Sequence, residues 1–248
     1  MINVLVFGSN GKMGAHVRNV LNSSSTCRLF CGVDAFKKGD ENYKYYSSLS
    51  QVEGKPDVII DFSFHSLCGE LLDYAVEKSV PVVLCTTGFT DDEKAKIIKA
   101  SEKIAIFWSG NMSLGISLLV DFAKKTALAF PNADIEIVEA HHNRKVDAPS
   151  GTALMLANSV KEARPNANFV FGRSGEGKRK PEDIGIHALR MANIVGEHEV
   201  LVTTETQQIL LKHTAYDRAL FADGAVAVVP FIISKQNGIF DMKDYIKG

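Results

Sequence analysis

Five residues near the middle of the chain form its densest group of side chains that could do chemistry. Two adjacent histidines, His141 and His142, are followed by Arg144, Lys145 and Asp147. Histidine exchanges a proton near neutral pH, and lysine and arginine attract anions. The group predicts acid–base chemistry on a small anion, with His141 and Lys145 as candidate proton donors. The alternative is an unspecialised polar loop between a strand and a helix.

The turn that directly follows this group predicts the start of a helix. Ser150 is a good N-cap, and apolar residues recur at helical spacing until Pro165 ends the pattern. The backbone amides of Gly151 and Thr152 would lie at the positive end of that helix, which favours a carboxylate or phosphate. Together with His142, Gly151 and Thr152 are therefore candidate substrate-binding residues.

A glycine-rich turn near the N-terminus predicts a dinucleotide site. After an apolar run at 3–7 the turn consists of Gly8, Ser9, Asn10, Gly11, Lys12, Met13 and Gly14. Its G-x-x-G-x-x-G spacing differs from the standard G-x-G-x-x-G, so a purely structural turn is the alternative. Asp34, at the end of the next expected strand (28–33), could accept hydrogen bonds from an adenosine ribose. The order of strand, turn, helix, strand and acid favours nucleotide binding.

The rest of the first half alternates between strands and helices. Strands are expected at 57–61, 80–85 and 104–108, with helices between them, the first opening at 62–63 and the second at a Thr90 capping box. This alternation predicts a Rossmann-like, doubly wound parallel sheet, whose ligands gather beyond the carboxyl ends of its strands. Residues 37–55 are expected to be a loop with one short element.

The second half predicts an α+β domain with an open mixed sheet and helices on one side. Helices are expected at 114–130 and 152–163, and strands at 134–140, 184–191, 199–204 and 207–213, the last two forming an antiparallel hairpin. We interpret His187, His198 and His213 as strand residues bonded to neighbours rather than catalysts. The polar segment 172–180 is expected to be a solvated rim, and 218–248 a helix followed by an apolar tail.

Composition limits the classes of partner. A net charge of −1 over 248 residues argues against nucleic acid or an anionic membrane, and no apolar run has the length of a membrane span. We interpret the N-terminus as lacking a signal peptide. The four cysteines show no paired spacing, which predicts buried free thiols in a reducing cytoplasm. We expect no metal, because neither the histidines nor the cysteines have zinc-ligand spacing.

The central segment resembles a known family. H-H-x-x-K-x-D-A-P-S-G-T-A, which this chain matches from His141 to Ala153, is the substrate signature of 4-hydroxy-tetrahydrodipicolinate reductase. The family also carries the G-x-x-G-x-M-G turn and an Asp-Phe-(Ser/Thr) segment like the one at Asp61. Cys85-Thr86-Thr87-Gly88 is similar to its Gly-Thr-Thr-Gly, with a cysteine in place of the first glycine. Ser109-Gly110-Asn111-Met112-Ser113 is similar to its Ala-(Pro/Ala)-Asn-(Phe/Met)-Ser loop.

This resemblance implies a fold, an assembly and a reaction. It implies a nucleotide domain over 1–111 and 218–248, a substrate and oligomerisation domain over 112–217, and a homotetramer. The reaction is the NAD(P)H-dependent reduction of dehydrated 4-hydroxy-tetrahydrodipicolinate, a small dicarboxylate, in lysine and diaminopimelate biosynthesis. The nicotinamide would lie near Cys85, Thr86 and Thr87 and the loop from Ser109 to Met112. The alternatives are another two-domain dehydrogenase of amino-acid metabolism and a dinucleotide sensor without turnover.

The choice between NADH and NADPH depends on the residues around Asp34. A carboxylate there repels the extra phosphate of NADPH. Lys37 and Lys38 in the next loop, and Lys12 in the glycine turn, are point charges that offset this repulsion. We therefore expect both cofactors to work, with NADH equal or modestly preferred.

Overall fold

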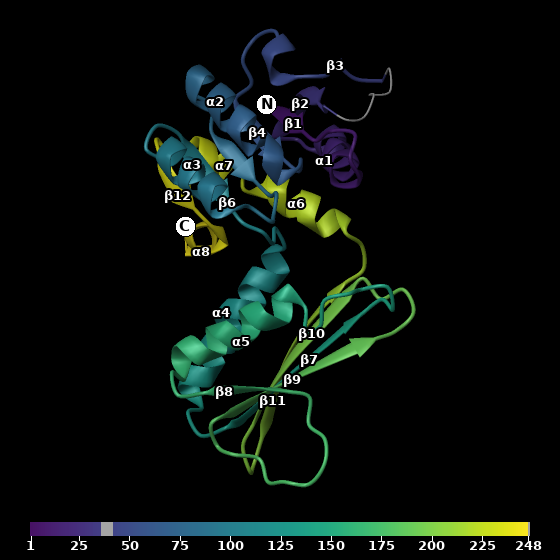
Figure 1. Cartoon of the computed structure of the whole chain (residues 1–248), viewed down its shortest axis with the longest axis vertical. Helices are drawn as coiled ribbons and strands as arrows, with labels where there is room; N and C mark the ends of the chain where they lie inside the picture. The colour runs from purple at the N-terminus through teal and green to yellow at the C-terminus, as the bar shows by residue number, and fades with distance from the viewer. Residues whose placement is uncertain (36–41, 248) are drawn as a thin grey trace. The chain divides into compact units, whose positions relative to one another are not determined.

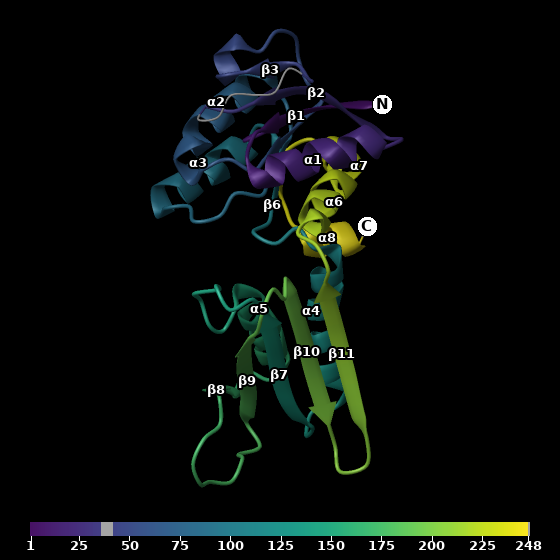
Figure 2. The same ribbon diagram turned by 90° about the vertical axis from the view of Figure 1, so that its right-hand side faces the viewer.

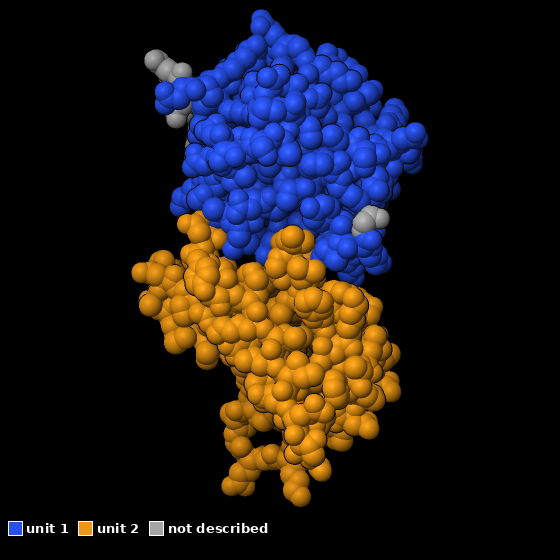
Figure 3. Space-filling view, turned by 180° about the vertical axis from the view of Figure 1, so that it is seen from behind, with its two compact units in different colours: residues 1–113, 219–248 blue, residues 114–218 orange. Residues whose placement is uncertain are grey.

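The computed structural model describes residues 1–35 and 42–247, and the chain divides into two compact units. One unit contains residues 1–113 and 219–248, and the other contains residues 114–218 (Figure 3). No helix in the described part of the chain has the length and apolar character needed to cross a lipid bilayer.

The first unit is built on a sheet in which every described strand pairs in parallel with its neighbours. Its order is β12-β6-β5-β4-β1-β2-β3. The strands are β1 (Ile2–Phe7), β2 (Cys27–Val33), β3 (Tyr45–Tyr46), β4 (Val58–Asp61), β5 (Val82–Leu84), β6 (Ala105–Trp108) and β12 (Gly238–Phe240). The chain order reverses at β1, which lies between β2 and β4. Such a switch point opens a ligand crevice at the carboxyl ends of the strands.

Helices cover both faces of this sheet (Figures 1 and 2). The elements on one face are α1 (Lys12–Ser23), α6 (Ala219–Ala227), α7 (Val229–Ile233) and α8 (Met242–Lys247). Those on the other are α2 (Cys68–Lys78) and α3 (Asp91–Ser101). Val4 and Val6 of β1 pack in the first layer, and Leu5 and Phe7 pack in the second. Because successive side chains of a strand point to opposite faces, a continuous apolar run is what a strand buried on both sides requires.

The second unit is a mixed sheet with its helices on one face. Its order is β11-β10-β7-β9-β8, with β7 antiparallel to β10 and parallel to β9. The strands are β7 (Asp134–His141), β8 (Asn168–Phe171), β9 (Asp183–Arg190), β10 (Gly196–Thr203) and β11 (Gln208–Ala215). Two helices, α4 (Leu114–Ala129) and α5 (Gly151–Ala163), lie side by side on the sheet (Figures 1 and 2). Ile135 and Ile137 of β7 face them and are fully buried.

The predicted fold class is confirmed, and several local elements differ from the sequence prediction. The hairpin of β10 and β11 is present in full register. After β4 the chain turns at 62–63 and passes through a 3₁₀ turn, η2 (His65–Leu67), before α2 begins, and α2 ends at Lys78 as expected. The loop before β4 contains two short elements, β3 and η1 (Leu49–Gln51), where one was expected.

The C-terminal segment is more structured than the expected helix and tail. A second helix, α7, follows α6 with Pro230 in its first turn. Proline lacks an amide hydrogen and fits the first turn of a helix, so a second helix begins where the apolar tail was expected. The short strands β12 and β8 each have an edge position and were not predicted. Three or four residues are too few for a periodicity to be detected.

Candidate active site

The glycine turn after β1 requires glycine at two positions. Gly8 has a φ of 80°, and a Cβ there would lie 2.6 Å from the carbonyl oxygen of Phe62. A Cβ at Gly14 would lie 2.2 Å from the carbonyl oxygen of Gly8. Both contacts are with backbone, which cannot move aside, so α1 can pack tightly onto the turn only because these residues have no side chain.

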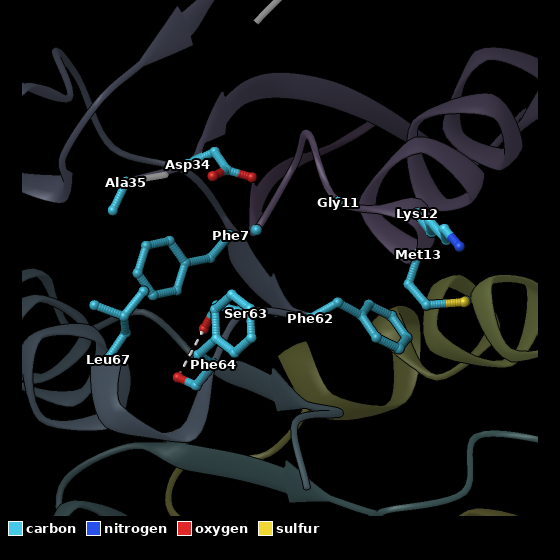
Figure 4. Close-up of a pocket in the computed structure, with 11 residues that line it drawn as sticks. Phe7, Gly11, Lys12, Met13, Asp34, Ala35, Phe62, Ser63, Phe64 and Leu67 are labelled. Carbon is cyan, nitrogen blue, oxygen red and sulfur yellow. Dashed lines mark hydrogen bonds between the residues drawn. The ribbon is translucent and has the colours of Figure 1, made fainter. Parts of the chain in front are cut away.

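Asp34 lies directly over this turn. Its Oδ2 accepts a hydrogen bond of 3.0 Å from the backbone amide of Asn10. A cavity of about 360 Å³ lies beside them (Figure 4). The predicted cofactor residues that line it are Gly8, Gly11, Lys12, Met13 and Asp34.

Ser9 and Asn10 face a different neighbour. The Tyr43 hydroxyl lies 3.3 Å from Oγ of Ser9 and donates to Oδ1 of Asn10. The Arg18 guanidinium also stacks over the ring of Tyr43, with its central carbon 4.1 Å from the ring centre. Sequence reasoning missed Tyr43, because it follows the glycine turn by some thirty residues and belongs to no motif.

A second cavity, of about 250 Å³, lies at the carboxyl ends of β4 and β5. Cys85, Thr86 and Thr87 line it, and it shares its Phe62–Phe64 wall with the first cavity. The Cys85 side chain is buried in the core, where burial first and the charge of Asp61 second raise the pKa of its thiol. A cysteine therefore replaces the usual glycine of this motif with its sulfur packed inward.

The loop after β6 lies against the same region. Oγ of Ser109 donates to the Asn111 carbonyl, and a Cβ at Gly110 would lie 3.3 Å from Cγ2 of Thr87. Oδ1 of Asn111 accepts from the amide of Ser113 at 3.0 Å. The Met112 side chain is only 2% exposed and belongs to the core. Met112 could therefore contact a cofactor only through its backbone.

In the second unit, cationic groups gather around His142. His141 is the last residue of β7, and His142 and Lys145 follow in the loop. Burial first, and then the charges of Arg144, Arg218, His141 and Lys145, lower the pKa of His142. Nδ1 of His142 is buried and has no hydrogen-bond partner among the described residues. Positive charge and an available ring nitrogen favour an anion at this position.

The helix after this loop begins as predicted. Ser150 is the N-cap of α5, and its Oγ accepts from the amide of Ala153 at 3.2 Å. Gly151 and Thr152 therefore occupy the first turn, where the helix dipole favours an anion. A Cβ at Gly151 would have no atom within 4 Å. Lys145 pairs with Asp147 at 2.8 Å, which lowers the pKa of Asp147.

A buried carboxylate behind His141 was not predicted. Glu139 is 0% exposed, and its Oε2 lies 2.5 Å from Nδ1 of His141. Arg190 pairs with both oxygens of Glu139, each at 2.9 Å. The sheet register explains this, because His141 of β7 pairs with Arg190 of β9 and Glu139 pairs with His198 of β10. The available signal was the spacing of two between Glu139 and His141, which puts both on one face of a strand.

His198 of β10 lies beside this group. Its ring centre lies 5.1 Å from that of His141, and its Nε2 lies 3.1 Å from Oγ of Ser150. Nδ1 of His198 has no partner in the described part of the structure. His187 is bonded as expected, to Glu136 at 2.8 Å, whereas Nδ1 of His213 is buried without a described partner.

Two further expectations concern cations. Lys37 and Lys38, which were predicted to help bind NADPH, lie outside the described residues. Across residues 1–35 and 42–247, no group of three His, Cys, Asp or Glu side chains is arranged to hold a metal ion. The described side chains thus form two arrangements: a glycine turn with an acid, and a histidine backed by a carboxylate beside cations and a helix start.

Comparison with known proteins identifies the family. Residues 2–112 match the model for the N-terminal part of dihydrodipicolinate reductase, and residues 115–246 match the model for its C-terminal part. A 4-hydroxy-tetrahydrodipicolinate reductase of Clostridium novyi is 41% identical over 249 residues, covering 100% of this chain and 99% of that protein. One of Caldanaerobacter subterraneus is 40% identical over 249 residues, with 100% and 99% covered.

Solved structures agree with this result. The dipicolinate-bound dihydrodipicolinate reductase of Paenisporosarcina sp. TG-14 has a TM-score of 0.83 and 26% identity, with 99% of both chains covered. The DAP dehydrogenase of C. glutamicum, at 12% identity, a TM-score of 0.60 and coverage of 97% and 92%, shares the fold alone. The chain therefore belongs to the dihydrodipicolinate reductase family, the NAD(P)H-using 4-hydroxy-tetrahydrodipicolinate reductases of lysine biosynthesis, and is an oxidoreductase.

Proposed function

We propose that NAD(P)H binds to the first unit and that the second unit binds the dicarboxylate and supplies a proton to it. The observation that carries this division is the group of cationic side chains around His142, followed directly by the start of α5. Cations and helix-terminal amides together suit a carboxylate. The relative that was solved with dipicolinate bound supports a dicarboxylate ligand.

The first unit fits a dinucleotide. The glycine turn carries no side chain at Gly8, Gly11 or Gly14, so a diphosphate can approach its amides. We assign the ribose to Asp34 and the nicotinamide to the second cavity, where Thr86 and Thr87 lie. Bound NAD(P)H supplies the hydride.

The loop and helix of the second unit would bind the substrate. We assign one carboxylate to Lys145 and His142, with the hydroxyl of Thr152 and the amides of Gly151 and Thr152 completing the site. Lys145 is held by Asp147 at 2.8 Å, and a substrate carboxylate would compete with that partner for the ammonium group. A dianion is favoured over a monoanion because the surrounding charges are positive.

We assign proton donation to His141. Hydride addition leaves a negative charge on the conjugated ring, and a proton from the imidazolium neutralises it. His141 is supported over Lys145, the second candidate, by its buried carboxylate partner, since Glu139 offsets the cost of a positive charge on a side chain that is 11% exposed. The hydride of the cofactor and the proton of His141 must both reach the same substrate ring.

We further propose dual cofactor use and a homotetramer. Asp34 favours NADH, and Lys12, which lines the same cavity, offsets its repulsion of the NADPH phosphate. The sheet face opposite α4 and α5 carries Leu201 and Leu210, directly paired across β10 and β11. Leu210 is 50% exposed, and this leucine pair, with ion pairs of Lys212 to Glu197 and Glu199 on the same face, suits a contact between copies. Four free, buried cysteines support a reducing cytoplasm as the compartment.

Turnover with freshly made substrate tests this proposal. Oxidation of NADH and of NADPH is followed at the nicotinamide absorbance band, and both should be consumed. Pyridine-2,6-dicarboxylate should raise the melting temperature of the parent protein, because a ligand stabilises the state that it binds. Lys145→Met should remove this rise, whereas Lys161→Met, in the last turn of α5, should keep it. Failure of turnover with either cofactor, together with no effect of the dicarboxylate, would refute the proposal.

A further inference from the structure

We propose that Glu139 is a positioning residue for proton transfer. Its carboxylate holds the His141 ring with a proton on Nδ1 and stabilises the imidazolium, so that the proton given to the substrate leaves from Nε2. The inference rests on the proposed role of His141 as the donor. Glu139 acts through that ring and contacts neither substrate nor cofactor.

The surroundings of Glu139 show that it accepts and does not donate. Its Oε2 faces Nδ1 of His141 at 2.5 Å and Nη1 of Arg190 at 2.9 Å. Its Oε1 faces Nη2 of Arg190 at 2.9 Å and the amide of Ser150 at 3.0 Å. Arg190 and a backbone amide can only donate, so the carboxylate is the acceptor in these contacts.

The charge of Glu139 follows from these bonds. Burial raises its pKa, but the hydrogen bonds from Arg190, His141 and the Ser150 amide outweigh burial and hold the pKa below its ordinary value. Glu139 is therefore ionised at neutral pH. An ionised carboxylate has no proton to give, so Nδ1 of His141 must carry the hydrogen that lies between them.

The other groups that face His141 come from four segments. Glu139 and His141 lie on the same strand, and the guanidinium of Arg190 on β9 pairs with Glu139. His198 on β10 has a pKa lowered to about 4 by burial and then by the charge of His141, so it is neutral at neutral pH. Lys145 in the following loop adds positive charge, whereas His142 beside it has a lowered pKa and is neutral at neutral pH. Glu139 is thus the negative group in direct contact with the ring, and it opposes the repulsion from Lys145.

The position of Nε2 is consistent with this assignment. Nε2 lies on the side of the ring away from Glu139 and next to Gly196 of β10. A Cβ at Gly196 would lie 3.1 Å from Nε2. Any larger residue there would press on the nitrogen from which the proton leaves.

Glu139→Gln tests the proposal, since glutamine keeps the shape and loses the charge. The kcat of this variant should fall by about tenfold to a hundredfold. This is part of the rate enhancement that a general acid usually contributes, because His141 itself is still present. The alkaline limb of the kcat profile should move to lower pH, since the negative charge in contact with the donor has been removed. KM and the dissociation constant of NADH should each stay within about threefold, because Glu139 contacts neither ligand.

Because Glu139→Gln leaves Arg190 without its carboxylate partner, a second variant is needed. A buried guanidinium without its carboxylate destabilises the fold. Glu139→Gln/Arg190→Gln removes both charges and should restore the melting temperature while kcat and the alkaline limb stay changed. If the double variant recovered parental kcat and the parental limb, Glu139 would be a structural residue only and the proposal would fail.

Glu136 offers a matched control on the same strand. It also bonds a histidine, His187 at 2.8 Å, and an arginine, Arg179 at 3.3 Å, but lies outside the proposed site. Glu136→Gln should leave kcat within about twofold of the parental value, and the alkaline limb of the kcat profile should stay at the parental pH. A comparable loss of kcat in both variants would overturn a specific role for Glu139.

Nitrogen-15 NMR of the histidine rings separates this inference from the proposed function. In the parent above the titration range, His141 should show a protonated Nδ1 and an unprotonated Nε2, and Glu139→Gln should lose this preference. A protonated Nε2 in the neutral parent would refute the inference without any turnover measurement. Absence of turnover in the parent, by contrast, would refute the proposed function while the tautomer result still stands on its own.

Discussion

His198→Gln should remove a pH-dependent part of the stability of the second unit. His198 is 4% exposed and lies between the ring of His141 and the hydroxyl of Ser150. Glutamine can still reach that hydroxyl, and it carries no charge at any pH. The substitution therefore removes a titration while keeping most of the packing.

The magnitude follows from the pKa of this histidine. Burial first, and then the charge of His141, lower it from 6.5 to about 4. Between these values the unfolded chain binds a proton that the folded chain does not, so folding stability is full above pH 6.5 and is lost as pH falls through about 4. The complete shift corresponds to about 3 kcal/mol, because each pH unit contributes about 1.4 kcal/mol.

Urea unfolding at fixed protein concentration measures this quantity. The free energy of unfolding is compared above pH 6.5 and at about pH 4, in the parent and in His198→Gln. All other titrating groups are shared by the two proteins. The difference between their decreases in the free energy of unfolding therefore isolates His198, and the decrease in the parent should be about 3 kcal/mol larger. Equal losses in both proteins would mean that His198 is not held neutral in the folded state, which would refute the reasoning.

Three predictions concern the reaction. His141→Gln should lower kcat by about a hundredfold or more while pyridine-2,6-dicarboxylate still binds, and turnover near the parental rate would exclude His141 as the donor. Thr152→Ala should mainly raise KM, because Thr152 lies in the first turn of α5 at the proposed carboxylate site, and an unchanged KM with a reduced kcat would argue against a binding role. The ratio of kcat/KM for NADH to that for NADPH, measured at fixed salt, should lie between one and about tenfold, since one exposed lysine contact changes the preference by about tenfold or less. A preference for NADPH of about a hundredfold would contradict this.

The sequence by itself determined the fold class and the presence of a glycine turn and a helix start. These features are local. In the turn from Gly8 to Gly14, a side chain at either end would clash with backbone atoms, which fixes the positions of these two glycines. The start of α5 depends on Ser150, which caps an amide three residues later. Successive side chains of β1 pack alternately into the two apolar layers, and this follows from a run of consecutive apolar residues. Interactions within one or two turns of chain can be inferred from residue types and spacing alone.

Only the tertiary structure decided which residues surround His141. Glu139 and His141 are two residues apart, but Arg190 and His198 reach them from 51 and 59 residues farther on. The register of β9 and β10 on either side of β7 creates those contacts, and register depends on the packing of the whole sheet. The same applies to β12, which is too short to show a pattern and forms only because β6 offers it an edge. A strand pairing gains its energy from a distant partner, so the chemistry that such pairings assemble cannot be deduced from local spacing.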